Sequence, residues 1–270
     1  MIGTNALTDV GRFLDVDGVR TFFVEQGDGE AVIMLHGAGP GVCAQVSWQQ
    51  NLDPLARAGF WTIAYDQPGF GRSGVPADHS LERRIHHARA FIDALGLTHY
   101  HLIGSSAGAY VAAQLALEDP RVDRLVLVAG SGLLSSVTEA PSAPPQEPAP
   151  TLRSVRALTE ETLVRRDLAT EDLVQLRFEM SSGPRYQAHL ARQAAPQRRS
   201  LADRLPTLRP KTLILWGKQD HLSGPDQALQ MFSLIPGAEL HLFDECGHWV
   251  QWDQAQRFNQ VVVDFLKAVD

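Results

Sequence analysis

Two adjacent serines lie between glycines in the stretch LIGSSAGAY, residues 102–110. The pattern G-x-S-x-G fits this stretch only with Ser106 at its centre. It is typical of a sharp strand-to-helix turn that exposes one hydroxyl above the edge of a sheet, and the glycines are needed because a side chain would crowd the turn. We therefore predict that Ser106 is a nucleophile. Ser105 is predicted to point away from the tip of the turn and to help shape a pocket.

A serine hydroxyl becomes a good nucleophile only when a base takes its proton and a carboxylate holds that base in place. In a parallel sheet these partners are expected just after late strands, where side chains project over the carboxyl edge. LHLFDECGHW places His248 after the last predicted strand, and of the ten histidines only His248 meets this condition. LILWGKQD places Asp220 shortly after the strand that ends at Gly217. We favour Asp220 as the acid, with Asp244 as the competing carboxylate, whose alternative role is capping or pairing.

Backbone N–H groups close to the serine are candidates for stabilising the negative charge that develops on an attacked carbonyl oxygen. One is the amide of Ala107, the residue after the predicted nucleophile. The other is expected in the glycine-rich turn HGAGPG, residues 36–41, and we predict the amide of Ala38. This turn contains neither G-x-G-x-x-G nor G-x-x-x-x-G-K, so anion stabilisation beside a serine is a better interpretation than phosphate binding.

The elements that must position these residues are buried strands that alternate with helices. RFLDV and VRTFFVEQ flank Asp17-Gly18 and predict a hairpin. Nearly unbroken apolar runs predict further strands at 31–36, 60–65, 100–104, 122–130, 211–217 and 238–243. Helices are predicted after the glycine-rich turn up to Ala58, at 81–96, at 106–118, between the last two strands and up to Asp270. We thus predict an α/β fold with a mostly parallel central sheet and helices on both of its faces.

The alternation is interrupted once. The stretch APSAPPQEPAP, residues 140–150, is too rich in proline for a regular element of the sheet, and residues 151–203 are charged and helical in pattern. We predict one α/β domain formed by residues 1–132 and 206–270, with a helical cap or lid inserted at 133–205. The alternative, a disordered linker between two domains, is disfavoured because the final segment has too few strands for a core of its own.

The composition is that of an ordinary globular protein, with 270 residues, 44% apolar and 20% charged. A net charge of −7 gives no reason to expect binding to nucleic acid or to an anionic membrane. Cys43 and Cys246 lie far apart without metal-ligand spacing, so we favour reduced thiols in a cytoplasmic protein over a disulfide. The N-terminal residues do not form the pattern of a signal peptide, and no apolar run is long enough to span a membrane.

Four stretches that coincide with these turns carry a resemblance: LHGAGPG, AYDQPGFGRS, GSSAGA, and CGHWVQW followed by FNQVVVDFL. On them the chain resembles the α/β-hydrolase superfamily, and more narrowly the meta-cleavage-product hydrolases, which split carbon–carbon bonds in ring-opened aromatic catabolites. The resemblance implies that an arginine of the cap grips the substrate's carboxylate. VQLRFE matches that segment and nominates Arg177, whose alternative role is a solvated residue on a helix face. Trp249 would line the pocket, and Gly37 and Gly39 are also expected to contact the substrate.

The chain departs from the family pattern at three places. The asparagine that usually precedes the nucleophile is Ser105, and the methionine that commonly follows it is Ala107, which enlarges the pocket. After the GPG turn the family has another asparagine, where this chain reads VCAQVSW. That polar contact is either lost or replaced by Gln45 or Ser47. The predicted catalytic triad of Ser106, Asp220 and His248 is unaffected by these departures. The identity of the substrate, however, does not follow from the family.

We expect a serine-dependent hydrolase that cleaves a carbon–carbon bond in an acid of the 2-hydroxy-6-oxo-dienoate type, with no metal or organic cofactor. In that chemistry His248 helps the dienol to become its keto tautomer before Ser106 attacks the carbonyl. The alternatives are a carboxylesterase or lactonase with the same triad, a cofactor-free ring-cleaving dioxygenase of the same fold, and a non-catalytic small-molecule receptor. Dehalogenases and epoxide hydrolases of this fold need a carboxylate at the position of the nucleophile, so Ser106 excludes both activities. We also expect a carboxylate as the small-molecule partner and a homodimer or higher homo-oligomer.

Overall fold

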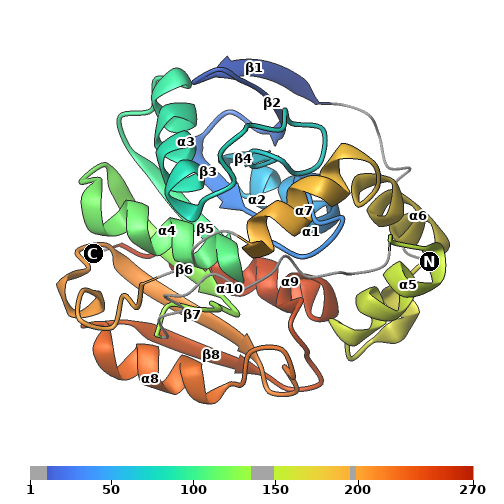
Figure 1. Cartoon of the computed structure of the whole chain (residues 1–270). Coiled ribbons are helices and arrows are strands. Elements are labelled where there is room, and N and C mark those ends of the chain that lie inside the picture. Colours follow the sequence, from blue (N-terminus) through green and yellow to red (C-terminus); the bar gives the residue numbers. More distant parts are fainter. Residues whose placement is uncertain (1–10, 135–148, 195–198, 270) are drawn as a thin grey trace.

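A computed structural model describes residues 11–134, 149–194 and 199–269 of the chain (Figure 1). Its eight strands form one sheet in the order β1-β2-β4-β3-β5-β6-β7-β8. Their bounds are β1 (Arg12–Val16), β2 (Val19–Gln26), β3 (Glu30–Leu35), β4 (Phe60–Tyr65), β5 (Tyr100–Ser105), β6 (Val122–Val128), β7 (Lys211–Gly217) and β8 (Glu239–Phe243). Strand β2 is antiparallel to β1 and β4, and the other pairs are parallel. The predicted hairpin is confirmed, with positive φ at Asp17 and Gly18.

Helices cover both faces of the sheet, as predicted. They are α1 (Ala44–Trp48), α2 (Leu52–Arg57), α3 (Leu81–Ala94), α4 (Ala107–Glu118), α5 (Leu152–Glu161), α6 (Glu171–Met180), α7 (Pro184–Ala194), α8 (Asp226–Leu234), α9 (Val250–Asp253) and α10 (Ala255–Lys267). Alternate side chains of β3 enter two separate cores: Ile33 and Leu35 pack with α3, α4 and α8, whereas Val32 and Met34 pack with α1, α2 and α10. This two-sided burial explains why the strands read as continuous apolar runs.

The helical stretch predicted from the glycine-rich turn to Ala58 consists of two short helices, α1 and α2. Asn51 stands between α1 and α2, and its side-chain amide donates to Asn259 Oδ1 of α10 at 2.8 Å. Asn51 is fully buried, and its side-chain N–H finds its partner on α10, whereas its Oδ1 accepts no hydrogen bond among the described residues. At the other end of the chain, α10 ends at Lys267.

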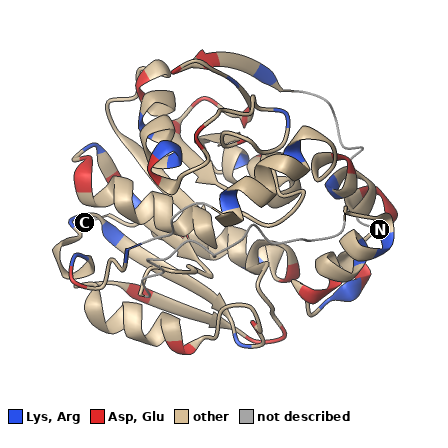
Figure 2. Cartoon of the chain, viewed as in Figure 1, with Lys and Arg blue, Asp and Glu red and all other residues tan. Residues whose placement is uncertain are grey.

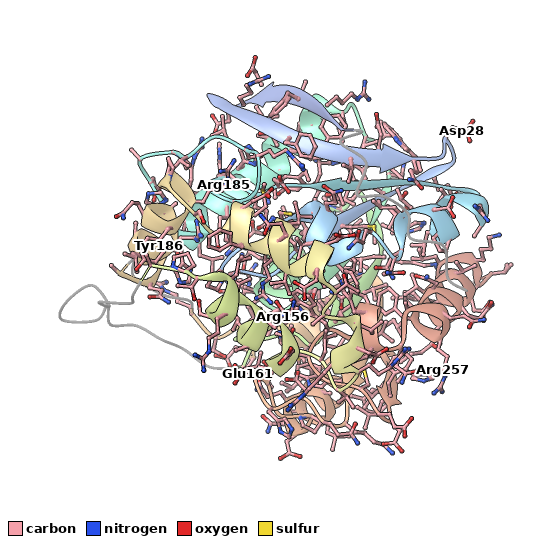
Figure 3. All side chains as sticks on the ribbon, turned by 90° about the vertical axis from the view of Figure 1, so that its right-hand side faces the viewer. Asp28, Arg156, Glu161, Arg185, Tyr186 and Arg257 are labelled. Atoms are coloured by element: carbon pink, nitrogen blue, oxygen red, sulfur yellow. The ribbon has the colours of Figure 1, made fainter. Side chains whose placement is uncertain are left out.

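Helices α5, α6 and α7, with two short 3₁₀ turns (Arg166–Leu168 and Leu205–Thr207), lie between β6 and β7 in the chain. Figure 3 shows this side of the molecule, with Arg156 and Glu161 on α5 and Arg185 and Tyr186 on α7. Helices α5 and α6 pack on the rest of the protein through an apolar cluster of Val42, Cys43, Val46, Val155, Leu163, Ala169, Leu173, Val174, Leu176, Met180, Trp249 and Trp252. Most of the proline-rich stretch 140–150 lies outside the described residues.

The carboxylate of Asp253 ties this inserted region to the last part of the chain. Its oxygens accept hydrogen bonds from the backbone N–H groups of Val164 (3.0 Å), Arg165 (2.9 Å) and Gly247 (2.8 Å). Gly247 directly precedes His248, so the same buried carboxylate fixes the position of the inserted region relative to the loop that carries His248.

Charged residues of both signs are interspersed along the elements (Figure 2). None of the helices in the described part of the chain has the length and apolar character needed to cross a bilayer.

Candidate active site

Ser106 lies at the tip of the turn between β5 and α4, with φ 53° and ψ −123°. Both glycines of the motif are required by close backbone contacts. A Cβ on Gly104 would lie 2.5 Å from the carbonyl oxygen of Gly108, and a Cβ on Gly108 would lie 2.4 Å from that of Leu35. The motif therefore fits the structure for a physical reason: the helix starts so close to the strands that only glycine can flank the serine.

His248 and Asp220 form a buried hydrogen-bonded pair. His248 Nδ1 lies 2.9 Å from Asp220 Oδ2, and a carboxylate can only accept, so Nδ1 donates. The other oxygen of Asp220 accepts from the backbone N–H groups of Leu222 and Ser223, both at 2.9 Å. These bonds fix the carboxylate, and with Nδ1 as the donor to it, Nε2 is the ring nitrogen that is available to accept a proton.

The competing carboxylate, Asp244, is exposed and has partners other than His248. Its side chain is 64% exposed and accepts a hydrogen bond from Gln219 Nε2 at 3.1 Å, with Lys218 Nζ at 3.8 Å. The hydrogen bond from Gln219 lowers the pKa of Asp244. Asp244 therefore has the pairing role that was its alternative, and the geometry favours Asp220 as the partner of His248.

The glycine-rich turn after β3 runs directly past Ser106. A Cβ on Gly37 would lie 3.2 Å from the Cβ of Ser106, and Ala38 and Gly39 line the same pocket. Ala107 is the first residue of α4, so its N–H has no acceptor within the helix. In the described part of the chain, no backbone hydrogen bond uses the N–H of Ala38. Ala107 directly follows the serine and Ala38 lines the pocket beside it, so both amides remain the predicted donors.

Two residues that the sequence analysis did not single out hold this turn in place. Burial lowers the pKa of His36 to about 3, so the ring is neutral. Its Nε2 accepts from the backbone N–H of Gln67 at 3.0 Å, and its Nδ1 donates to the carbonyl of Gly37 at 2.7 Å. The side-chain amide of Gln67 donates to the carbonyl of His36 at 2.6 Å, and its oxygen accepts from Arg84. Buried hydrogen bonds therefore fix the backbone that carries Ala38.

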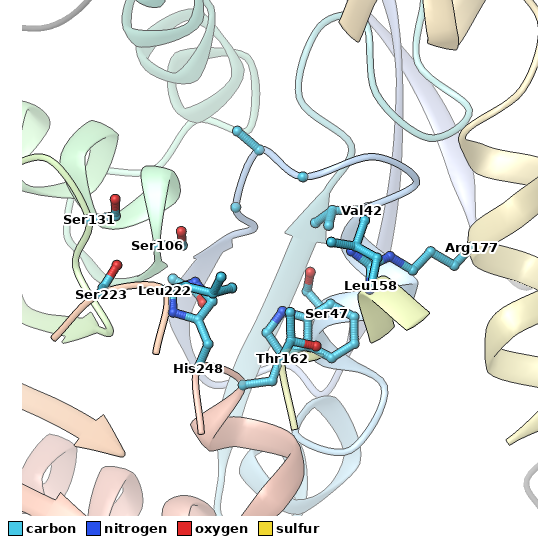
Figure 4. A pocket seen from close by; sticks show the side chains of 15 residues that line it. Val42, Ser47, Ser106, Ser131, Leu158, Thr162, Arg177, Leu222, Ser223 and His248 are labelled. Carbon is cyan, nitrogen blue, oxygen red and sulfur yellow. The ribbon is translucent and has the colours of Figure 1, made fainter. Parts of the chain in front are cut away.

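A cavity of about 170 Å³ opens at Ser106 and His248 (Figure 4). Its predicted lining residues are Gly37, Ala38, Gly39, Ser105, Ser106, Arg177, His248 and Trp249. Residues that sequence reasoning missed also line it: Val42, Ser131, Leu158, Thr162, Leu222 and Ser223. Ser131 and Ser223 lie in the loops after β6 and β7, and no sequence motif marks either of them. No motif marks Leu158 or Thr162 either.

Arg177 lies in this pocket and is 1% exposed, so the alternative of a solvated helix face is wrong. Its Nε donates to the carbonyl of Pro40 at 3.0 Å, and Nη1 donates to Thr159 Oγ1 at 3.0 Å. The guanidinium carbon lies 4.8 Å from the ring centroid of Trp249. These contacts join α6, α5, the GPG turn and the histidine loop around one cation.

The charge of Arg177 has no anionic partner among the described residues. Burial lowers the pKa of the guanidinium to about 10, which still leaves it protonated at neutral pH. A buried charge is strongly disfavoured unless it is paired. The site therefore has the electrostatics of a binding point for an anion.

The positions that depart from the family pattern have separate roles in the structure. Ser47 lines the pocket, whereas Gln45 does not and accepts from Arg72 Nη1 at 3.0 Å. Ser47, and not Gln45, can therefore replace the missing asparagine. Ser105 is buried at the end of β5 and lines the pocket.

Cys43 and Cys246 are both free and buried, so they are not bridged, as predicted. Burial raises the pKa of both thiols, which makes them poor nucleophiles. Over the described ranges, no group of three or more His, Cys, Asp or Glu side chains is placed to hold a metal ion.

Comparisons with known proteins place the chain in a family. A family model described as "alpha/beta hydrolase fold" matches residues 30–255. The 2-hydroxy-6-oxo-6-phenylhexa-2,4-dienoate hydrolase of Comamonas testosteroni is 34% identical, over 94% of this chain and 93% of its own. The chain belongs to the meta-cleavage product hydrolases of the α/β-hydrolase family.

Two further relatives support this assignment. The 2-hydroxymuconate semialdehyde hydrolase of Pseudomonas sp. (strain CF600) is 33% identical, over 97% of this chain and 95% of its own. The solved structure of a meta-cleavage product hydrolase from Pseudomonas fluorescens IP01 is 32% identical, with a TM-score of 0.82 over 95% of this chain and 97% of its own. This α/β-hydrolase therefore aligns with these relatives over nearly its whole length, including the inserted helices.

Proposed function

We propose that this hydrolase cleaves the carbon–carbon bond next to the 6-oxo group of a 2-hydroxy-6-oxo-dienoate. The observation that carries the proposal is the buried, anion-free guanidinium of Arg177 in the same pocket as Ser106. The relatives that match nearly the whole chain bear names of hydrolases for dienoates of this kind, and each such substrate is a carboxylate.

The proposed reaction adds one water across the bond between C5 and C6. His248 and the pocket first help the dienol become its keto form, with a proton placed on C5. His248 Nε2 then takes the proton of Ser106, whose oxygen attacks the C6 carbonyl, while the N–H groups of Ala38 and Ala107 stabilise the oxyanion. The C5–C6 bond breaks, and the leaving dienolate takes the proton held by His248. His248 then takes a proton from water, whose oxygen attacks the acyl-serine, and the acyl group leaves as a carboxylic acid while the proton returns to Ser106.

In this proposal Arg177 binds the carboxylate of the dienoate. A carboxylate that enters a mostly apolar pocket loses its hydration, so it needs a cation there. The planar guanidinium suits a carboxylate better than the ammonium of lysine does, because it offers two parallel N–H donors. Trp249 supports this orientation from the face of the guanidinium.

Replacing Arg177 with alanine is expected to separate acids from esters. A charge-assisted hydrogen bond of this kind contributes about 1.5–3 kcal/mol, so its loss should lower kcat/KM for dienoates by about 10- to 150-fold. Neutral esters offer no carboxylate and should be nearly unaffected. Arg177→Lys is expected to restore the dienoate activity only in part. Steady-state kinetics on both substrate types check this.

Arg153→Ala is the matched control, because Arg153 is an exposed arginine on the same inserted region. It should leave both activities unchanged. Equal losses on dienoate and ester in Arg177→Ala, or no loss on either, would favour an esterase with the same triad over the proposed C–C hydrolase.

We also propose that residues 133–205 form a cap over the site, with its hinges in 140–150 and near Leu205-Pro206. Limited digestion with a broad-specificity protease is then expected to cut first within 140–150, because that proline-rich stretch cannot join the sheet, and to leave the α/β core intact. Mass spectrometry of the early fragments identifies the site of the cut. Early cleavage inside β3 to β7 would contradict this division of the chain.

The proposed site of action is the cytoplasm, which is supported by the two free, buried thiols. A homodimer or higher homo-oligomer remains a prediction that sedimentation would check.

A further inference from the structure

We propose that Thr159 is a positioning residue for Arg177: its hydroxyl oxygen holds the guanidinium so that the Nη2 side is left to bind the substrate's carboxylate. This inference rests on the proposed recognition of a dienoate by Arg177, and it adds a residue that does not itself line the pocket. The observations that carry it are the hydrogen bonds of Thr159 and the donors of Arg177 that remain.

The hydroxyl oxygen of Thr159 can only accept from Arg177. Thr159 lies in α5 and is fully buried, and its Oγ1 donates its one hydrogen to the carbonyl of Val155 at 2.7 Å. The lone pairs of this oxygen are left for Arg177 Nη1, which lies 3.0 Å away. Because a guanidinium has donors and no acceptor, the bond to Val155 fixes the hydroxyl in an orientation that suits an arginine.

The donors of Arg177 are used unequally. Nε donates to the carbonyl of Pro40 at 3.0 Å, and Nη1 donates to Thr159. Nη2 makes no hydrogen bond to any of the described residues, and it lies next to the glycine-rich turn, where a Cβ on Gly39 would be 3.5 Å away. The N–H groups of Nη2, with the second N–H of Nη1, are therefore the donors that remain for a carboxylate.

Hydrogen bonds also join the end of α5 that carries Thr159 to the histidine loop. The hydroxyl of Thr162 donates to the carbonyl of Thr159 at 2.7 Å, and the carbonyl of Thr162 accepts from the N–H of Trp249 at 3.1 Å. Trp249 directly follows His248, and its ring centroid lies 4.8 Å from the guanidinium carbon of Arg177. Thr159 thus fixes the guanidinium relative to the catalytic histidine.

Loss of the Thr159 hydroxyl is expected to weaken the recognition of acids alone. Without this acceptor the buried Nη1 of Arg177 has an unsatisfied donor, so the guanidinium is expected to leave its position. A displaced guanidinium binds the carboxylate less well and orients the substrate less well toward the serine. An ester without a carboxylate makes no use of the guanidinium. A positioning role therefore predicts different effects on the two substrate types, whereas a general loss of packing lowers both activities.

The test compares Thr159→Val, which keeps the shape of the side chain without its hydroxyl, with Thr159→Ser, which keeps the hydroxyl. We expect Thr159→Val to lower kcat/KM for a 2-hydroxy-6-oxo-dienoate by about 3- to 30-fold and to leave that for a neutral ester within about twofold. Thr159→Ser should keep most of the dienoate activity. Ser182→Ala is the matched control and should leave both activities unchanged. Its hydroxyl, in the same inserted region, also donates to a carbonyl four residues earlier, that of Phe178, but does not line the pocket.

Equal losses on dienoate and ester in Thr159→Val, or no loss on the dienoate, would overturn this inference. A Thr159→Ser variant as impaired on the dienoate as Thr159→Val would overturn it as well. If circular dichroism shows that Thr159→Val does not fold, Thr159→Ala is compared with Thr159→Ser, and equal dienoate activities of these two overturn it. In each of these cases the proposed function stands if Arg177→Ala still separates dienoate from ester. Equal effects of Arg177→Ala on both substrates overturn the proposed function and this inference together.

Discussion

Ser106→Ala is expected to lower kcat for the dienoate by at least about a thousandfold, whereas Ser105→Ala keeps most of the activity. The reason is geometric: Ser106 occupies the strained tip of the turn at φ 53°, while Ser105 ends a buried strand. Kinetics on the two purified variants measure the difference. The residual rate in Ser106→Ala would come from the oxyanion donors and from substrate binding alone.

These adjacent serines are matched controls for each other, because each substitution removes one hydroxyl from the same turn. Circular dichroism of both variants checks that the fold is retained. Similar losses in both would contradict the assignment of Ser106. A fully active Ser106→Ala would instead support the dioxygenase alternative, in which the histidine–aspartate pair abstracts a proton and the serine is dispensable.

His248→Ala and Asp220→Asn are expected to be nearly as severe, each lowering kcat by about three to four orders of magnitude. In Asp220→Asn the side-chain oxygen should still accept from the N–H groups of Leu222 and Ser223, which turns the NH₂ group toward His248. The histidine must then accept at Nδ1 and carry its proton on Nε2, so it can no longer act as the base. Kinetics of the single variants test this.

The three residues should also behave as one unit. Either substitution combined with Ser106→Ala is expected to lower kcat by less than a further factor of about three. The reason is that the histidine and the aspartate act only through the serine nucleophile. Asp244→Asn is the control and should keep its activity, since Asp244 is exposed and paired with Gln219. A larger loss in Asp244→Asn than in Asp220→Asn would make Asp244 the acid.

The order of strands and helices could be predicted from the sequence, because parallel strands buried on both faces leave continuous apolar runs. The turn at Ser106 could also be predicted, because the close backbone contacts in a strand-to-helix turn of this kind leave room only for glycine on either side of the serine. The break between α1 and α2 was not predicted, although Pro54 in the first turn of α2 has no N–H to bond back to the preceding turn and was an available signal.

The pocket was only partly predictable for a similar reason. VQLRFE does not distinguish a buried arginine from a solvated one, and the burial of Arg177 depends on Pro40, Thr159 and Trp249. Ser131 lies in a loop whose sequence has no motif. Its place in the pocket follows from the neighbouring positions of β5, β6 and β7 in the sheet, which the chain order alone does not give.

The most direct test of the account is the turnover of a 2-hydroxy-6-oxo-dienoate by the unmodified hydrolase, measured beside an ester of similar size without a carboxylate. The account predicts that the dienoate is consumed with release of one dienoic acid and one carboxylic acid. Its kcat/KM should exceed that of the ester by at least about tenfold, the lower bound of what the bond to Arg177 contributes. Turnover of the ester with no cleavage of the dienoate would contradict the proposed C–C hydrolysis.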